Sequence, residues 1–289
     1  MQNMNKLLAA GFICLTFAAA GFAQTTQPVL SDADKTLGTG KVIGLDYYYN
    51  HQVKNGVQFH YTWEDTALSG YSKFGDVWKS FGATLADLHD APTVDALKHF
   101  SVYIIVNPST VKTAADGKPN YVQPADCDAV ASWVNDGGVL GLFANDVNTA
   151  ELEHFSTLSE KFGITMNKDI RNKVPNARDR RPGTFAASLF TDHPLFQGLQ
   201  MIYMKEICTL QVKDPAKAIL TAPKETGDGT DIIMAESHYG KGLVFVVGDP
   251  WVYNEYIDVT APGLPIQNRQ AAVNLARWLL TAASAPQTP

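Results

Sequence analysis

The sequence lacks the short motifs that identify many enzyme classes. No G-x-G-x-x-G turn follows the first predicted strand and no Walker-type loop is present, so nothing forms the usual phosphate cradle of a nucleotide site. Neither C-x-x-C nor H-E-x-x-H occurs, which removes the strong zinc signatures. G-x-S-x-G and G-x-C-x-G elbows are also missing. Function must therefore be inferred from less specific patterns.

Cysteine and positive charge are both scarce. The 289 residues hold 23 Lys+Arg against 29 Asp+Glu, a formal net charge of −6, which argues against nucleic acid or an anionic membrane surface as partner. Of 3 cysteines, Cys14 lies in the N-terminal apolar run. Cys127 and Cys208 are too few for a disulfide framework; they could pair in an oxidising compartment, but their apolar surroundings favour buried free thiols.

Long apolar runs are missing except at the N-terminus. Lys6 is followed by an apolar stretch that ends in small residues near Ala23. This run is shorter than the roughly 20 residues that span a membrane and is typical of a signal peptide. We therefore predict a signal peptide over 1–23 and an exported, periplasmic or secreted protein without a membrane span. A flexible leader over 24–40, a single domain over 41–282 and a tail over 283–289 complete the predicted organisation.

Buried-strand patterns alternate with amphipathic helix patterns in the first half. The 45% hydrophobic residues suffice for a full core. Strands are predicted at 42–45, 83–88, 101–106 and 138–143, and helices at 71–81, 124–136 and 149–162. This alternation predicts an α/β fold with a doubly wound, mostly parallel sheet. Later strands at 207–212, 218–221, 231–236 and 242–247, joined by Gly-containing turns, predict extra β-hairpins before a final helix.

Acids, amides and aromatic residues follow three of the predicted strands. Ligands of open α/β sheets bind beyond the carboxyl ends of the strands, so we expect these side chains to share a site. Ordinary turn-forming residues also gather at strand ends, which is the alternative. The residues that we predict to bind substrate at these ends are Asp46, Asn50, Asn145, Trp251 and Asn254.

The segment FHYTWED (59–65) is the most unusual local sequence. Aromatic faces stack on sugar rings while carboxylates and amides bind their hydroxyls, so a carbohydrate ligand is favoured. His60 and Trp63 are predicted to bind substrate and Glu64 to be catalytic. The alternative is that Trp63 caps the core and Glu64 is a solvated acid.

The catalytic prediction combines Glu64 with His154 and Asp249. Glu64 and Asp249 would form the pair of carboxyl groups that a glycosidase needs. Asn148 and Glu151 resemble a capping box, which leaves His154 and its neighbour Glu153 for acid–base chemistry or ligand binding. A surface pair is the alternative there.

Basic side chains supply two further predictions. Lys205 is predicted to bind substrate, with a simple ion pair to Glu206 as the alternative. Four arginines could dock an anionic sugar such as a uronate, unless they form a solvated loop: Arg171, Arg178, Arg180 and Arg181. No cofactor is predicted. A divalent metal is left open, because His60, His154, Glu153 and Asp249 could meet in space.

Two long segments carry a family resemblance. VASWVNDGGVLGLFAND and YGKGLVFVVGDP resemble the class I glutamine amidotransferase-like superfamily, in particular its ThuA-like branch. Ala144 and Asn145 stand where amidotransferases carry the cysteine nucleophile, so the resemblance implies a flavodoxin-like fold without amidotransferase activity.

A second resemblance is to the domain found with secreted proteins similar to unsaturated rhamnogalacturonyl hydrolases. It rests on LDYYYN, FHYTWEDTALSGYS, PNYVQP, AELEHF, HPLF and GDPWVYNEY. The all-helical catalytic toroid of those hydrolases has no counterpart in this chain. What the resemblance implies is a substrate class, the oligosaccharides of pectin that bear uronic acids.

Together these observations predict an exported carbohydrate-active protein. It would be a glycoside hydrolase, with lyase chemistry as a possibility, or the partner of a glycoside hydrolase of the same pathway, and it would act on acidic oligosaccharides of rhamnogalacturonan or pectin. The alternative from another class is a noncatalytic carbohydrate-binding or assembly module.

Overall fold

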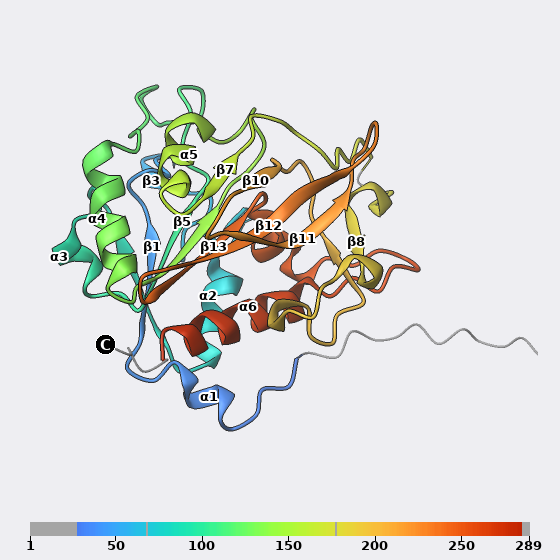
Figure 1. Ribbon diagram of the computed structural model, residues 1–289, viewed down its shortest axis with the longest axis horizontal. Helices are drawn as coiled ribbons and strands as arrows, with labels where there is room; N and C mark the ends of the chain where they lie inside the picture. The colour runs from blue at the N-terminus through green and yellow to red at the C-terminus, as the bar shows by residue number, and fades with distance from the viewer. Residues whose placement is uncertain (1–27, 68, 177, 285–289) are drawn as a thin grey trace, which may run out of the picture.

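The computed structural model describes residues 28–67, 69–176 and 178–284, without the side chains of residues 251 and 255 (Figure 1). The predicted signal peptide lies outside this part of the chain. Within the described residues, none of the helices combines the length and apolar character needed to cross a membrane.

A nine-stranded mixed sheet forms the centre of the fold, in the order β4-β1-β5-β6-β13-β12-β10-β7, with β11 paired to β12. Five strands are parallel to one another: β1 (Val42–Asp46), β4 (Thr84–Leu88), β5 (Val102–Val106), β6 (Val139–Phe143) and β13 (Gly242–Val247). The antiparallel strands are β7 (Ile164–Met166), β10 (Leu210–Val212), β11 (Lys217–Pro223) and β12 (Thr230–Tyr239). This arrangement confirms the predicted doubly wound, mostly parallel sheet with additional hairpins.

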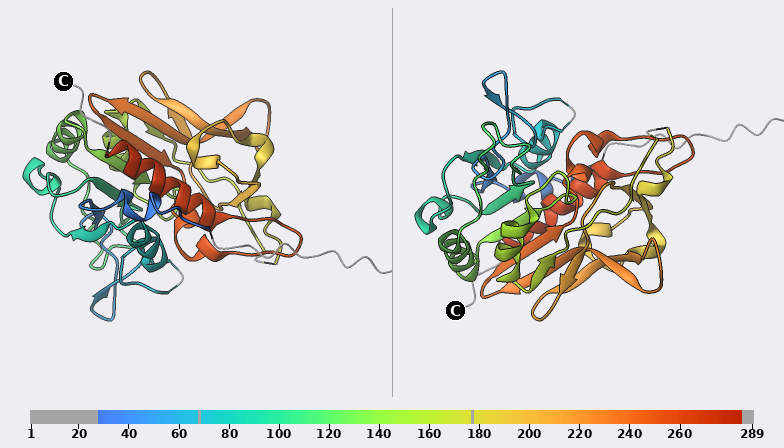
Figure 2. Two further views of the ribbon diagram at one scale, coloured as in Figure 1. Left: turned by 90° about the horizontal axis from the view of Figure 1, so that it is seen from below. Right: turned by 90° about the horizontal axis from the view of Figure 1, so that it is seen from above.

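Helices cover both faces of the parallel strands (Figure 2). The helices α2 (Ser72–Ser80) and α6 (Asn268–Ala282) pack against one face, where alternate strand residues such as Leu45 and Phe143 form one buried core. On the other face, α4 (Pro124–Asn135) and α5 (Leu152–Glu160) close a second core around residues such as Tyr103 and Leu142. Every second residue of a strand points to the same face, which is why continuous apolar strands serve two cores.

The smaller elements lie in the connections. Two-stranded sheets form from β2 (Val53–Lys54) with β3 (Val57–Gln58), and from β8 (Thr184–Ala186) with β9 (Met201–Tyr203). Short helices are α3 (Val94–Leu97) and the 3₁₀ turns η1 (Arg181–Gly183), η2 (Ala187–Leu189), η3 (Pro194–Phe196), η4 (Trp251–Tyr253) and η5 (Glu255–Asp258). The sequence did not predict these elements individually, because they are too short to show a period.

The described part of the predicted leader is attached to the domain. Residues 34–37 form α1 (Asp34–Leu37), and Leu37 packs against the core under α6. Arg277 Nε donates to Asp34 Oδ1 at 2.7 Å, and this contact lowers the pKa of Asp34 to about 2. This part of the leader is therefore held in place and differs from the flexible spacer that its composition predicted.

Candidate functional site

An open cavity of about 420 Å³ lies at the carboxyl ends of β5 and β6, on the face covered by α4 and α5. The loop after β5 supplies one wall, and the loop after β6 with the first turn of α5 supplies the other. Its volume falls in the range of small-molecule sites, and its position fits the rule for open α/β sheets. The residues that line it are Thr110, Val111, Lys112, Tyr121, Val147, Asn148, Ala150, Glu151, Leu152, Glu153, His154 and Lys168.

The first turn of α5 organises the cavity through Glu151. Its side chain accepts hydrogen bonds from the backbone N–H groups of Glu153 and His154, so Glu151 is itself the N-cap of the helix. The predicted capping pair with Asn148 is wrong, because the Asn148 N–H instead donates to Asp146 Oδ1 at 2.8 Å. A carboxylate at this position satisfies backbone donors that have no helical partner and also favours the positive end of the helix dipole.

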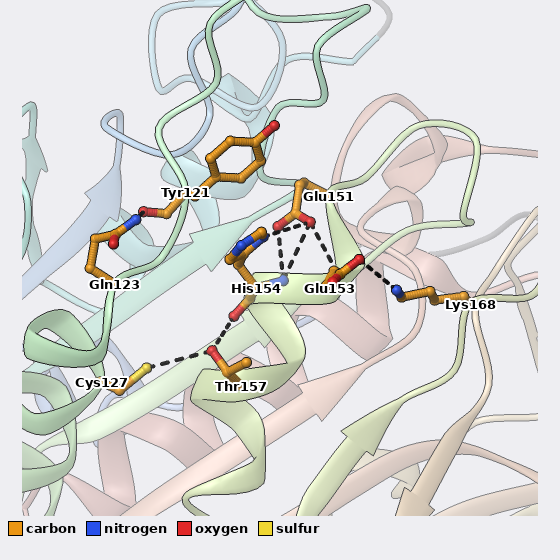
Figure 3. Close-up of polar contacts among 8 residues, drawn as sticks. All are labelled: Tyr121, Gln123, Cys127, Glu151, Glu153, His154, Thr157 and Lys168. Atoms are coloured by element: carbon orange, nitrogen blue, oxygen red, sulfur yellow. Dashed lines mark hydrogen bonds and ion pairs between the residues drawn. The ribbon is translucent and has the colours of Figure 1, made fainter.

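Glu151 also holds the ring of His154. Glu151 Oε1 and His154 Nδ1 are 3.1 Å apart (Figure 3). An ionised carboxylate only accepts, so in neutral His154 this contact places the proton on Nδ1 and leaves the Nε2 lone pair available. The imidazole is 42% exposed and the Glu151 side chain 13% exposed. The pair is therefore a carboxylate-oriented histidine that a ligand in the cavity can reach.

The cavity also contains a tyrosine ring, an ion pair and a separate lysine. The Tyr121 ring centre lies 4.5 Å from that of His154. Lys168 Nζ contacts Glu153 Oε2 at 2.7 Å, and this contact lowers the pKa of Glu153. Lys112 is exposed at the rim and has no ion pair among the described residues. The cavity thus offers one aromatic face, one oriented histidine and one lysine that is not neutralised.

Below His154 the helix contacts a buried thiol. His154 O accepts from Thr157 Oγ1 at 2.6 Å, and that hydroxyl lies 3.8 Å from Cys127 Sγ (Figure 3). Burial raises the pKa of Cys127, which keeps the thiol protonated and unreactive. Cys127 and Cys208 are both buried and free, as their apolar surroundings favoured.

Two of the other predicted site residues, Asn145 and Asp249, lie beside the core on the opposite face of the sheet. Phe143 and Val247 pair in register as the last residues of β6 and β13. Beyond these ends, Asn145 contacts Tyr61, and Asp249 acts electrostatically on Tyr71 and Tyr253. All three tyrosines belong to the core under α2 and α6. Asn145 and Asp249 are both buried, at 1% and 0% exposed. The sequence predicted these two residues to share a binding site, but their burial keeps a ligand in solvent from reaching either of them.

The FHYTWED segment covers this buried cluster. Tyr61 OH lies 3.4 Å from Asn145 Nδ2, and the Tyr61 ring packs edge-on against Tyr71. His60 and Tyr61 have φ of 60° and 51°, a left-handed backbone that costs energy in residues other than glycine. His60 is half-buried, and burial lowers its pKa. The turn at 60–61 is therefore a strained element that closes over the strand ends.

Trp63 is buried in the core, whereas its neighbour Glu64 is exposed. Trp63 is 9% exposed, packs in the core and donates from Nε1 to Ala86 O at 2.9 Å. Glu64 is exposed, and Tyr47 OH donates to its Oε2 at 2.6 Å. The core-capping alternative therefore describes Trp63, whereas Glu64 remains accessible.

Asp46 and Asn50 form a buried structural unit between β1 and β5. Tyr103 OH and the backbone N–H of Tyr49 both donate to the Asp46 carboxylate at 2.9 Å. Burial nevertheless raises the pKa of Asp46 to about 7. Asn50 is fully buried and donates from Nδ2 to His60 O at 2.7 Å. Neither side chain faces the cavity, so their role in the structure is to shape the loops at the strand ends.

The last predicted binding residues are Lys205, which follows β9, and Trp251 and Asn254, which follow β13. Lys205 Nζ is 3.1 Å from Glu206 Oε2, and Asn254 is 1% exposed at the N-cap of η5. Trp251 lies in η4, and its side chain is outside the described part of the structure. Among the described residues, no three His, Cys, Asp or Glu side chains are grouped as a metal site would require.

The predicted single site is thus divided by the sheet. His154 and Glu153 line the cavity, whereas Asn145, Asp249 and Asn254 lie on the other face. Sequence reasoning missed Tyr121, Lys112 and the second role of Glu151. The i to i+3 spacing of Glu151 and His154 was the available signal for their contact.

No protein-family model and no curated protein matches the sequence. Similar solved structures exist. The N-terminal domain of mmIFT52 is 17% identical with a TM-score of 0.59, over 83% of this chain and 98% of that one. A cytoplasmic protein, STM1381 from Salmonella typhimurium LT2, is 13% identical with a TM-score of 0.52, over 83% of this chain and 98% of that one.

A ThuA-like protein from Bacteroides uniformis is 15% identical with a TM-score of 0.44, over 87% of this chain and 94% of that one. At such identities the likeness shows a shared fold alone, and the last match is too distant to carry an argument. The flavodoxin-like fold is therefore confirmed, whereas the link to rhamnogalacturonyl hydrolases stays a prediction.

Proposed function

We propose that this protein is an exported carbohydrate-active protein that binds an acidic oligosaccharide in the cavity beside α5. The observation that carries the proposal is the Glu151–His154 contact of 3.1 Å at the edge of a cavity that also contains Tyr121 and Lys112. Tyr121 offers a ring face for sugar C–H groups, and Lys112 offers a positive charge for a uronate carboxylate. Rhamnogalacturonan and pectin fragments carry both features.

The chemistry that these groups support best is elimination at a uronate. His154 Nε2 takes the proton at C5, which is acidified by the adjacent carboxylate, and the lysine charge stabilises the carbanion that develops. The electron pair forms the C4–C5 double bond as the C4–O bond to the leaving sugar breaks. The imidazolium returns its proton to the leaving oxygen, so the reaction balances without a cofactor.

Hydrolysis, the first prediction from the sequence, has less support in this cavity. A glycosidase needs two carboxyl groups that are free to act as acid and as nucleophile or base. Glu151 already accepts from two backbone N–H groups and contacts His154, while Glu153 is paired with Lys168. Outside the cavity, Asp249 is fully buried and Glu64 is exposed, which does not favour their joint action on one sugar bond.

A noncatalytic binding module remains the second candidate. It is favoured by the same burial of Asp249 and by the engagement of both cavity carboxylates. Such a module would bind acidic oligosaccharides, alone or beside a glycoside hydrolase of the same pathway, without converting them.

One assay separates these proposals. The purified protein is incubated with rhamnogalacturonan and homogalacturonan oligosaccharides, and the ultraviolet absorbance of unsaturated uronates is followed together with product chromatography. We expect turnover that His154→Gln lowers by at least about a hundredfold, while the exposed control His99→Gln keeps full activity. Binding without turnover would favour the module. Saturated products would favour hydrolysis, and failure to bind would refute the carbohydrate proposal.

A further inference from the structure

We infer that a second site, formed around Tyr256 beyond the end of β13, binds an oxyanion, and that its ligand is the carboxylate of a sugar acid. The ligand class rests on the proposed function, whereas the anion preference rests on contacts in the structure. The loop that carries Tyr256 packs through Val252 and Ile257 into the core under α2 and α6. The site is therefore separate from the cavity, which lies on the other face of the sheet.

The first observation concerns Arg180. Its guanidinium carbon lies 5.3 Å from the ring centre of Tyr203 and 5.5 Å from that of Tyr256. These two rings are 5.3 Å apart at 68° and form an aromatic corner against the arginine. Arg180 also makes a side-chain hydrogen bond to Tyr203. These contacts fix the planar guanidinium, and the rest of its five N–H donors can serve a ligand.

Arg180 differs from the other arginines of its segment, because Arg178 is exposed and the other two are paired with carboxylates. Arg171 pairs with Asp231 and Arg181 with Asp179, each at 2.8 Å. Arg180 has no carboxylate partner among the residues that the structure describes. A half-buried guanidinium held by two aromatic rings without a carboxylate is well suited to take one from a ligand.

A second cation, Lys205, contacts the ring of Tyr256. Lys205 Nζ lies 5.7 Å from the Tyr256 ring centre, and its side chain is 17% exposed. Two acidic groups act nearby. Glu206 contacts Lys205, and the pKa of Tyr203, raised chiefly by burial, is raised further by the charges of Asp249 and Glu206. The positive charge of Lys205 is thus partly compensated, and Arg180 supplies the charge that remains for a ligand.

A buried donor adds an independent observation. Asn254 Oδ1 accepts from Tyr256 N at 3.4 Å, which places this amide next to the same residue. Asn254 is 1% exposed, and its Nδ2 has no hydrogen-bond partner within the described part of the chain. Buried donors are almost always satisfied, so an unpaired amide next to Tyr256, whose ring contacts both cations, supports a ligand here that accepts hydrogen bonds.

A sugar acid fits these groups better than an inorganic anion does. Its carboxylate can accept from the guanidinium, preferably through two parallel bonds, while the apolar face of its ring can lie on the partly exposed Tyr256. Sulfate would satisfy the donors without using the aromatic surface. Galactose would use the aromatic surface without the charge.

Calorimetric titration of the purified protein with D-galacturonate tests the inference. The variants are Arg180→Gln, Lys112→Gln at the cavity and the double variant, with Arg178→Gln as a matched control because Arg178 is exposed in the same segment. We expect Arg180→Gln to weaken one binding event at least tenfold, Arg178→Gln and Lys112→Gln to retain that event, and the double variant to lose all binding. Galactose and sulfate should bind at least tenfold more weakly than galacturonate.

The possible failures are distinguishable. Unchanged binding in Arg180→Gln, or loss of all binding in Lys112→Gln, overturns this inference and leaves the cavity proposal standing. If sulfate binds as tightly as galacturonate, the ligand is not specifically a sugar acid. If galactose binds as tightly as galacturonate, the charge of the ligand plays no role. If thermal melting shows that Arg180→Gln is unfolded, Arg180→Lys replaces it: the charge is kept and the planar fork is lost, so galacturonate should bind more weakly, and unchanged affinity would refute the site.

Discussion

Glu151 both begins the helix that carries His154 and contacts the ring of that histidine, with Oε1 3.1 Å from Nδ1. One carboxylate therefore sets the helix, the orientation of the imidazole and its tautomer. A substitution of Glu151 should therefore change both the stability of the protein and the rate of the proposed reaction.

Glu151→Ala should lower both stability and turnover. Loss of an N-cap costs about 1 kcal/mol, and the freed imidazole should reduce kcat by roughly 10²-fold or more, as loss of a positioned acid–base does. Chemical denaturation and the elimination assay measure the two effects. Glu153→Ala is the control, because its exposed contact with Lys168 is of a kind worth at most about 1 kcal/mol. Equal kcat in wild type and Glu151→Ala would contradict the role of the contact.

Occupying the cavity with a larger side chain should block the ligand. Val147 lines the cavity and is 38% exposed, so Val147→Trp can project into it at little cost, within about 0.5 kcal/mol, as is usual for surface substitutions. We expect oligosaccharide binding to weaken at least tenfold in calorimetry. Val29→Trp, at a position 92% exposed and outside the cavity lining, should bind like wild type. Tight binding by Val147→Trp would place the ligand elsewhere.

Asp46 should make stability fall as the pH rises towards neutrality. Its pKa is raised from 3.8 to about 7 by burial, so the folded protein holds this proton more tightly than the unfolded chain. The stabilisation is complete below about pH 4 and is lost as the pH rises through about 7. Denaturation at successive pH values measures the slope. Asp46→Asn should reduce the fall between these limits, and an identical slope in the variant would disprove the assignment.

The Asp34–Arg277 contact should hold α1 to the domain and show the opposite pH dependence. The pKa of Asp34 is lowered to about 2, chiefly by the hydrogen bond from Arg277. Its stabilisation is therefore present above about pH 4 and is lost as the pH falls through about 2.

The corresponding variant is Asp34→Asn. At neutral pH it should lose about 1 kcal/mol or less and speed amide hydrogen exchange in residues 31–40. Asp32→Asn is the control, since among the described residues Asp32 forms its ion pair with the exposed Lys35. Unchanged exchange in Asp34→Asn would mean that the apolar contact of Leu37 alone holds the segment.

The local pattern of apolar residues was sufficient to predict the main strands and helices of the fold. The apolar runs of β1, β5, β6 and β13 and the helices α2, α4 and α5 appear in the structure within a few residues of their predicted limits. These elements bury complete faces, so their sequence period is strong. The short α1, the β8–β9 pair and the 3₁₀ turns have no period to detect, because their positions depend on contacts with distant segments such as Arg277.

The sequence by itself determined that strands alternate with helices, that polar residues follow the strands, and that Glu151, Glu153 and His154 begin a helix. Only the tertiary structure decided on which face of the sheet each polar residue lies. Adjacent positions of a strand point to opposite faces, and the loops beyond its end then follow the packing of the helices around them. As a result, His154 lines an open cavity, whereas Asp249, which follows another strand, is buried.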